Sequence, residues 1–142
     1  MKKIDRFDGN FCFLSNFYPA TVELEDGIVY PTSEHAFQAM KTTNMDERRA
    51  VAVCATPGQS KRKGRKVPLR PDWEDIKIAV METVVRAKFQ QHQDLEERLI
   101  QTGNAELIEG NTWQDRFWGV CGTGENHLGK ILMKIRDDLT RQ

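Results

Sequence analysis

Apolar residues recur at helical spacing in the second half of the chain. The longest such stretch, residues 73–91, predicts an amphipathic helix at the centre of the core. Its inward stripe is expected to consist of Ile76, Val80, Met81, Val84, Val85, Ala87 and Phe89. The same spacing predicts a helix that begins near Asp94 and ends at Gly103, and a last helix over residues 126–139.

Short strands and turns are expected in the first thirty residues. Asp26-Gly27 lies between two short apolar runs, which predicts a two-stranded antiparallel hairpin. The segments Phe11-Cys12-Phe13-Leu14 and Phe17-Tyr18 are expected to supply aromatic side chains to the core. A further short strand is expected over residues 105–109.

Two short helices should follow the hairpin. Pro31 cannot lie inside a helix and Thr32 or Ser33 can cap one, so a helix is expected to begin here. Residues 46–54 predict a second helix, which the Thr-Pro-Gly sequence at 56–58 would end. With 142 residues, the chain is expected to form a single compact α+β domain over residues 1–142, mostly helical and with a small antiparallel β-hairpin.

Charge and cysteine content narrow the class of protein. Acidic and basic residues balance at 21 each, so no net field attracts nucleic acid or an anionic membrane. No apolar run approaches the length of a membrane span, and the first residues lack the apolar stretch of a secretory signal. The three cysteines form no Cys-x-x-Cys pair, and the three histidines show no ligand spacing. We therefore expect a cytoplasmic protein without membrane association, bound metal or cofactor.

An acid and an amine are expected on one face of the helix that begins near Thr32. Glu34 and Lys41 are seven residues apart, nearly two turns, with Gln38 between them. Their backbones should be roughly 10 Å apart, too far for an i,i+4 ion pair and suited to lining two ends of a small pocket. The alternative is that both residues merely complement the helix dipole.

A basic segment follows the second short helix. It contains Lys61, Arg62, Lys63, Arg65 and Lys66, and Arg70 comes soon after. Such runs are most often solvated faces. The alternative is a contact with phosphate, DNA or RNA, in which the arginines would contribute most because their forked donors match phosphate oxygens.

A second group of candidate residues lies in the loop at residues 110–119, which holds two tryptophans, a phenylalanine, an acid and an arginine. Trp118 near Asp115 could form a platform for a stacked base or a sugar, or the aromatic residues could fold the loop onto the core. Asn126 could cap the last helix and leave its N–H groups facing an anion. Asn16 would either bond its own backbone in a turn or act as a fixed donor beside a ligand.

Six motifs occur in order along almost the whole chain. They are Leu14-Ser15-Asn16-Phe17, Pro31-Thr32-Ser33-Glu34-His35-Ala36-Phe37-Gln38-Ala39-Met40-Lys41, Arg70-Pro71-Asp72-Trp73-Glu74, Ala87-Lys88-Phe89, Asp115-Arg116-Phe117-Trp118-Gly119 and Leu128-Gly129-Lys130-Ile131-Leu132-Met133. Together they closely resemble the YbiA-like, or NADAR, family of N-glycosidases. The resemblance implies a mostly helical α+β fold and hydrolysis of the N-glycosidic bond between a ribose and a base.

The resemblance also implies which residues form the site. Glu34, Lys41, Trp73, Asp115 and Trp118 match the family's site residues by identity and local context. On this basis we expect Lys41 to attack the anomeric carbon and pass through an imine, while Glu34 stabilises positive charge or moves protons. Asp115 would orient a ribose hydroxyl or activate water, and Trp118, together with Trp73, would stack on the base.

Substrate phosphate would be held by Arg65 and Arg70, and Asn16 would contact the substrate. Members of the family remove ADP-ribose from guanine in nucleic acid or cleave phosphoribosylamino-pyrimidine intermediates of riboflavin synthesis. The basic segment favours the first substrate, as either ADP-ribosylated nucleic acid or a nucleotide. A non-catalytic module that binds ADP-ribose or NAD is the other alternative, and a protein that only binds nucleic acid is disfavoured by the near-zero net charge.

Overall fold

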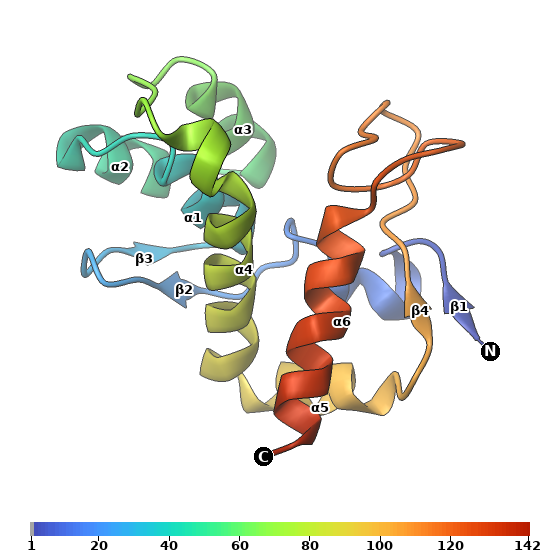
Figure 1. The fold of residues 1–142 in the computed structure, drawn as a ribbon. Coiled ribbons are helices and arrows are strands. Elements are labelled where there is room, and N and C mark those ends of the chain that lie inside the picture. Colours follow the sequence, from blue (N-terminus) through green and yellow to red (C-terminus); the bar gives the residue numbers. More distant parts are fainter. Residues whose placement is uncertain (1) are drawn as a thin grey trace. The chain divides into compact units, whose positions relative to one another are not determined.

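The computed structural model describes residues 2–142, which divide into two units. The central unit is Asn16–Gln91, and the terminal unit combines the chain before Asn16 with His92–Gln142. Figure 1 shows the elements of each unit. The mostly helical α+β class predicted from the sequence is confirmed.

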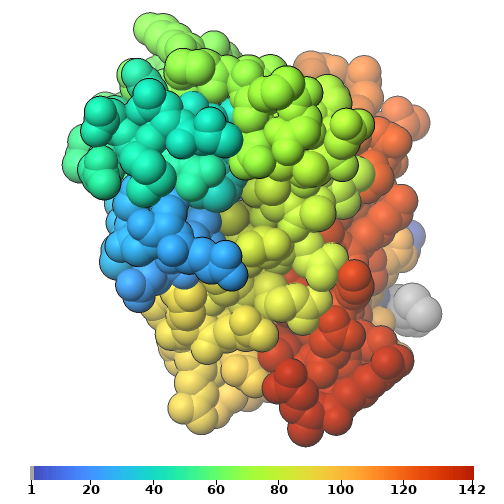
Figure 2. Space-filling view, turned by 60° about the vertical axis from the view of Figure 1, so that its left-hand side comes forward, coloured from blue at the N-terminus to red at the C-terminus, as the bar shows by residue number. Residues whose placement is uncertain are grey.

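The central unit begins with a hairpin and continues with four helices. Its elements are β2 (Val22–Glu23), β3 (Val29–Tyr30), α1 (Ser33–Ala39), α2 (Met45–Ala52), α3 (Pro57–Gly64) and α4 (Trp73–Gln91). The two strands pair antiparallel with Val22 opposite Tyr30, and Gly27 in the turn has a positive φ of 77°. The hairpin prediction is therefore confirmed. Figure 2 shows the face on which the hairpin lies beside α2 and α4.

Helix α1 lies at the middle of the central unit. It contacts β3, α2, α3 and α4, and all seven of its residues are buried. The hydroxyl oxygen of Thr32 accepts the backbone N–H of His35 at 3.1 Å, as expected of an N-cap. The helix ends at Ala39, so Lys41 lies in the turn after it and not in its last turn as predicted.

Helix α3 contains most of the basic segment and was not predicted. The Thr-Pro-Gly sequence interpreted as a stop signal begins this helix, because the Thr56 hydroxyl caps it by accepting the N–H of Gln59 and Pro57 occupies its first position. The same residues can therefore end one helix and start the next.

The bounds of α4 are those predicted, but its inward face is rotated. Met81, Val84, Val85 and Phe89 are buried as expected, whereas Ile76, Val80 and Ala87 are only half-buried. In their place Lys88 is buried, with 1% of its surface exposed and its ammonium over the rings of Tyr18 and Phe89.

The terminal unit has its own small core. Its elements are β1 (Lys3–Ile4), the 3-10 helix η1 (Gly9–Leu14), α5 (Gln93–Gln101), β4 (Glu106–Leu107) and α6 (His127–Thr140). Strand β1 pairs parallel with β4, and α6 packs on β4 and α5. Among the described residues no helix combines the length and the apolar character needed to cross a membrane.

Two aromatic residues expected in the core lie at the surface. Phe11 is 38% exposed and Phe17 is 46% exposed, so their predicted core role is wrong. Their neighbours Phe13 and Leu14 are buried in the terminal unit, and the Arg98 guanidinium stacks on the Phe13 ring at 4.2 Å.

Candidate active site

The Glu34 carboxyl group is held inside the central unit. The side chain is 8% exposed, and its Oε2 accepts a hydrogen bond of 2.6 Å from the Nε2 of Gln38, one turn later on α1. Its backbone N–H donates to the carbonyl oxygen of Asn16 at 3.1 Å. The Asn16 carbonyl thus holds the backbone of this acid, and Gln38 holds its side chain.

Asn16 supports that turn from the preceding loop. Its Oδ1 accepts from the Ser33 hydroxyl at 2.8 Å, and its Nδ2 lies 3.3 Å from the sulfur of Met81 on α4. With 7% of its surface exposed, Asn16 bonds to helices on two sides of it and not to its own loop backbone. The predicted contact of Asn16 with a ligand stays a prediction.

Lys41 is half-buried and lies close enough to Glu34 to interact with it electrostatically. Burial lowers the pKa of the Lys41 amine, the Glu34 carboxylate opposes that effect, and the cations Arg65, Lys61 and Lys77 lower the pKa further. A lowered pKa enlarges the fraction of neutral amine at neutral pH. Glu34 and Lys41 therefore interact electrostatically, and the pocket that they were predicted to line stays a prediction.

The cations around Lys41 come from two helices and the loop between them. Lys61 belongs to α3, Arg65 is its C-cap, and Lys77 lies on α4 and pairs with the exposed Glu74 at 2.8 Å. Lys77 was not among the predicted site residues, because nothing in the sequence distinguishes a lysine one turn into a long helix from an ordinary surface lysine. Together these groups make the surroundings of Lys41 attractive to an anion.

The backbone of Arg70 bonds to Lys41, whereas its side chain bonds to an acidic residue. Its N–H donates to the Lys41 carbonyl at 2.8 Å, while its guanidinium makes two hydrogen bonds to the Asp72 carboxylate, at 2.7 and 3.2 Å. This pairing lowers the pKa of Asp72. The phosphate role predicted for Arg70 stays a prediction, and it would require Arg70 to share its donors with Asp72.

Trp73, the first residue of α4, is packed into the central unit. Its side chain is 5% exposed, and its ring lies 5.1 Å from the Phe37 ring, centroid to centroid. An indole that packs on a neighbouring ring contributes to the core whether or not it also contacts a substrate. The base-stacking role predicted for Trp73 stays a prediction.

Asp115 and Trp118 lie in the terminal unit, in the loop that precedes α6. The Asp115 Oδ1 accepts the N–H groups of Phe117 and Trp118, at 3.2 and 2.9 Å. Asn111 closes the loop by accepting the N–H of Asp115 and donating to its carbonyl. The Trp118 ring stands edge-on against the Phe117 ring at 4.8 Å, and both tryptophan and carboxylate are half-buried.

Asn126 does not cap α6 with its side chain, which corrects one expectation. Its backbone is left-handed, with φ of 55°, and its side chain bonds to the backbone of Leu107 and Glu109. The first N–H groups of α6 donate to the carbonyls of Phe117 and Trp118. They are therefore used to hold the aromatic loop and do not face an anion.

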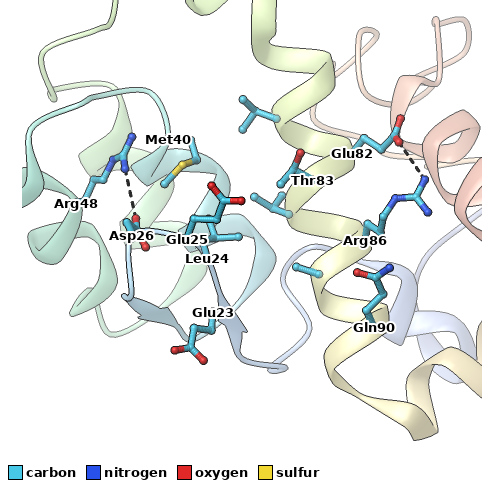
Figure 3. Close-up of a pocket in the computed structure, with 13 residues that line it drawn as sticks. Glu23, Leu24, Glu25, Asp26, Met40, Arg48, Glu82, Thr83, Arg86 and Gln90 are labelled. Carbon is cyan, nitrogen blue, oxygen red and sulfur yellow. Dashed lines mark hydrogen bonds and ion pairs between the residues drawn. The ribbon is translucent and has the colours of Figure 1, made fainter.

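A cavity of about 670 Å³ lies elsewhere in the central unit, between the hairpin and α4 (Figure 3). Met40 and Arg48 complete its wall, and the figure shows two charge pairs there, Arg48 with Asp26 and Arg86 with Glu82. Glu34 and Lys41 do not belong to its lining. Within residues 2–142 no group of three or more His, Cys, Asp or Glu side chains is arranged to hold a metal ion.

Comparison with known proteins gives consistent results. Residues 5–140 match the NADAR domain family. The chain is 40% identical to the N-glycosidase YbiA of Escherichia coli over 129 residues, which cover 88% of this chain and 79% of that protein. An N-glycosidase of Nostoc punctiforme is 38% identical over 136 residues, 90% of this chain and 85% of that protein.

Two further comparisons concern a longer protein and a solved structure. A riboflavin biosynthesis protein of Vibrio vulnificus is 39% identical over 136 residues, which cover 93% of this chain and 36% of that protein. The chain thus spans about a third of that relative. The NMR structure of Escherichia coli YbiA superposes with a TM-score of 0.88 at 35% identity, covering 99% of this chain and 86% of the other.

Proposed function

Because the chain belongs to the NADAR family, we propose that it is an N-glycosidase that hydrolyses the bond between a ribose and a nitrogen base. The similar proteins from Escherichia coli and Nostoc punctiforme carry that name and match over most of their length. The observation that carries the proposal within the structure is that the buried Glu34 carboxyl interacts electrostatically with the Lys41 amine, whose pKa is lowered by burial. Recognition of a sugar alone would not require such a pair, which disfavours a non-catalytic binding module.

The chemistry asks for a negative group beside the sugar and a nucleophile at its C1 atom. Departure of the base builds positive charge on C1, which the Glu34 carboxylate stabilises. The neutral Lys41 amine donates its lone pair to C1 while the bond from C1 to the base breaks. The base leaves with the electron pair of that bond and gains a proton, which is balanced by the proton that the bonded lysine nitrogen loses. Opening of the sugar ring then gives an imine, and water adds to C1 to release the lysine and the ribose.

The aromatic loop supplies the remaining groups. Asp115, whose carboxylate is oriented by two backbone N–H groups, positions a ribose hydroxyl or activates the water. Trp118 stacks on the departing base, with a contribution of about 1–3 kcal/mol. The cations around Lys41, among them Arg65, hold the phosphate of the substrate.

Removal of ADP-ribose from guanine in nucleic acid or nucleotides is the substrate choice that we favour. A polyanionic substrate suits the three cations near Lys41 and the exposed Arg62 and Lys66 of the basic segment. The same segment would contact DNA or RNA. Lys63 is less available, because it pairs with Glu47 at 3.2 Å. The second candidate, cleavage of phosphoribosylamino-pyrimidine intermediates, is favoured by the name of the Vibrio vulnificus relative.

Product release decides between these substrates. The protein is incubated with ADP-ribosylated guanosine, with ADP-ribosylated DNA and RNA, with NAD and with riboflavin precursors, and the released base is identified by chromatography. Borohydride added during turnover should trap a covalent adduct in the wild type and none in Lys41→Ala. If the wild type never traps and Lys41→Ala keeps most of its rate, hydrolysis by two carboxylates replaces the imine route. If no substrate is cleaved, the protein is not an N-glycosidase of these compounds.

A further inference from the structure

Gln38 occupies the position on α1 between Glu34 and Lys41, and its amide has two different environments. Its Nε2 donates to the Glu34 Oε2 at 2.6 Å, a short hydrogen bond typical of an ionised acceptor. Its Oε1 is buried and has no hydrogen-bond partner among the residues that the structure describes. The side chain as a whole is 4% exposed. One end of the amide is therefore engaged with the acid, and the other end is enclosed by protein.

The group that encloses it is Gly64, the last residue of α3. A Cβ added to Gly64 would collide with the Oε1 of Gln38, so the amide rests directly on the Gly64 backbone. No residue larger than glycine allows α3 to approach α1 so closely while the amide keeps this place. The backbone of Gly64 therefore limits how far the Gln38 side chain can move away from Glu34.

This contact also fixes which way the amide points. If the amide were flipped, its carbonyl oxygen would face the Glu34 carboxylate oxygen, and its two N–H groups would face the Gly64 Cα, which cannot accept them. The observed orientation instead presents a donor to the carboxylate and a carbonyl oxygen to the Cα–H, a weak but favourable contact. The glutamine can thus hold Glu34 only as a hydrogen-bond donor.

We propose that Gln38 is a positioning residue, which holds the Glu34 carboxylate in the orientation used at the sugar C1 atom, and that Gly64 keeps Gln38 in place. This inference rests on the proposed glycosidase function. Glu34 acts on charge that develops in the transition state, so losing its orientation should lower kcat and leave KM nearly unchanged.

The first test compares two substitutions that each add one methyl group to α3. In Gly64→Ala the new Cβ displaces the Gln38 amide, whereas in Gly58→Ala the new Cβ has only ordinary contacts, at 3.8 Å or more. We expect kcat of Gly64→Ala to fall about ten- to a hundredfold, the range for a lost hydrogen bond to a charged group. Gly58→Ala should keep the wild-type kcat, and both should keep KM within about twofold. Equal rates for the two variants would overturn the proposal.

The second test is a double-substitution cycle. Gln38→Ala should lose kcat to the same extent as Gly64→Ala, because each removes the hydrogen bond that Gln38 donates to Glu34. Of the three atoms nearest to a Cβ at position 64, Gln38→Ala removes the amide oxygen and its carbon and leaves only the Cβ of residue 38, at 3.1 Å, which a small shift relieves. The double variant should therefore be no slower than Gln38→Ala alone. If the kcat losses of the two single variants multiply in the double variant, Gly64 acts through something other than Gln38, and the role proposed for Gly64 is wrong.

A third measurement does not depend on activity. In ¹⁵N-labelled protein, the side-chain NH₂ resonances of Gln38 should move in Glu34→Ala and stay in place in Lys41→Ala. Unmoved resonances in Glu34→Ala would overturn the inference even in an active enzyme. If the wild type cleaves none of the substrates while these resonances move as expected, the hydrogen bond stands and the glycosidase function fails.

Discussion

Trp73 is buried, and this leads to a prediction that distinguishes a role in the core from a role in binding the base of the substrate. Its indole is 5% exposed and packs on the Phe37 ring at 5.1 Å, with 55° between the planes. A ring face that packs on Phe37 cannot also hold a base. Replacing Trp73 by leucine removes the aromatic surface and keeps an apolar side chain, so this substitution tests both roles at once.

The cost of Trp73→Leu follows from the buried area. A buried aromatic side chain covers about 150–250 Å², of which leucine restores more than half. Losing roughly 100 Å² at about 25 cal/mol per Å² costs about 2.5 kcal/mol, and the lost ring pair adds about 1 kcal/mol. For a chain of this size, the resulting 3–4 kcal/mol lowers Tm by about 10 °C.

The assay is a thermal melt followed by circular dichroism, combined with KM for the best substrate of the release screen. We expect Tm of Trp73→Leu to fall by about 10 °C and KM to stay within about twofold. Phe37→Leu, which removes the other ring of the pair, is the matched control and should be destabilised less. An unchanged Tm would refute the argument from burial. A KM that rises more than fivefold in Trp73→Leu alone would show that the indole contacts the base.

Three further predictions concern single residues. Glu34→Gln should lose most of the kcat at an unchanged Tm, whereas unfolding would mean that Glu34 mainly stabilises its helix. Burial lowers the pKa of His35, so the unfolded chain binds the proton more tightly than the folded protein does. The free energy of unfolding of the wild type should therefore fall as the pH drops below about 6.5, and it should fall less in His35→Gln. Asn126→Ala should lower the free energy of unfolding by about 3 kcal/mol, because it loses two hydrogen bonds and places alanine in a left-handed backbone conformation. Asn126→Gly should cost about 1 kcal/mol less, since glycine adopts this conformation without strain, and denaturant unfolding measures both values.

Local signals predicted the elements whose ends are set by neighbouring residues. The Asp26-Gly27 turn and the Thr32 cap both act over four residues or fewer, and the structure has a hairpin and a helix where they indicated them. The start of α3 was missed because the sequence Thr56-Pro57 can either end the preceding helix or cap the next one. Strand β4 lies within the strand expected over residues 105–109, but its parallel pairing with β1 joins residues about a hundred positions apart, and no signal in the sequence indicated that partner.

Side-chain environments were predicted less well than elements, because they depend on distant parts of the chain. Lys88 counted as a polar position in the pattern of α4, yet it is buried, and its ammonium lies over the ring of Tyr18, seventy residues earlier. In the site, the spacing of Glu34 and Lys41 placed them close enough to interact electrostatically, whereas the pocket predicted between them stays a prediction. The pairing of Arg70 with Asp72 was not foreseen, although the two residues are close in sequence, because an X-Pro-X turn allows several side-chain directions.

The position of the Glu34 carboxyl depends on packing more than on the helix that carries it. A helix of seven residues is too short to be stable alone, and every residue of α1 is buried against its neighbours. Asn16 bonds to its first turn, and Gly64 fits against its middle through Gln38. Substitutions at these two contacts should therefore change the rate without touching a catalytic group, and a rate set only by Glu34 and Lys41 would be insensitive to both.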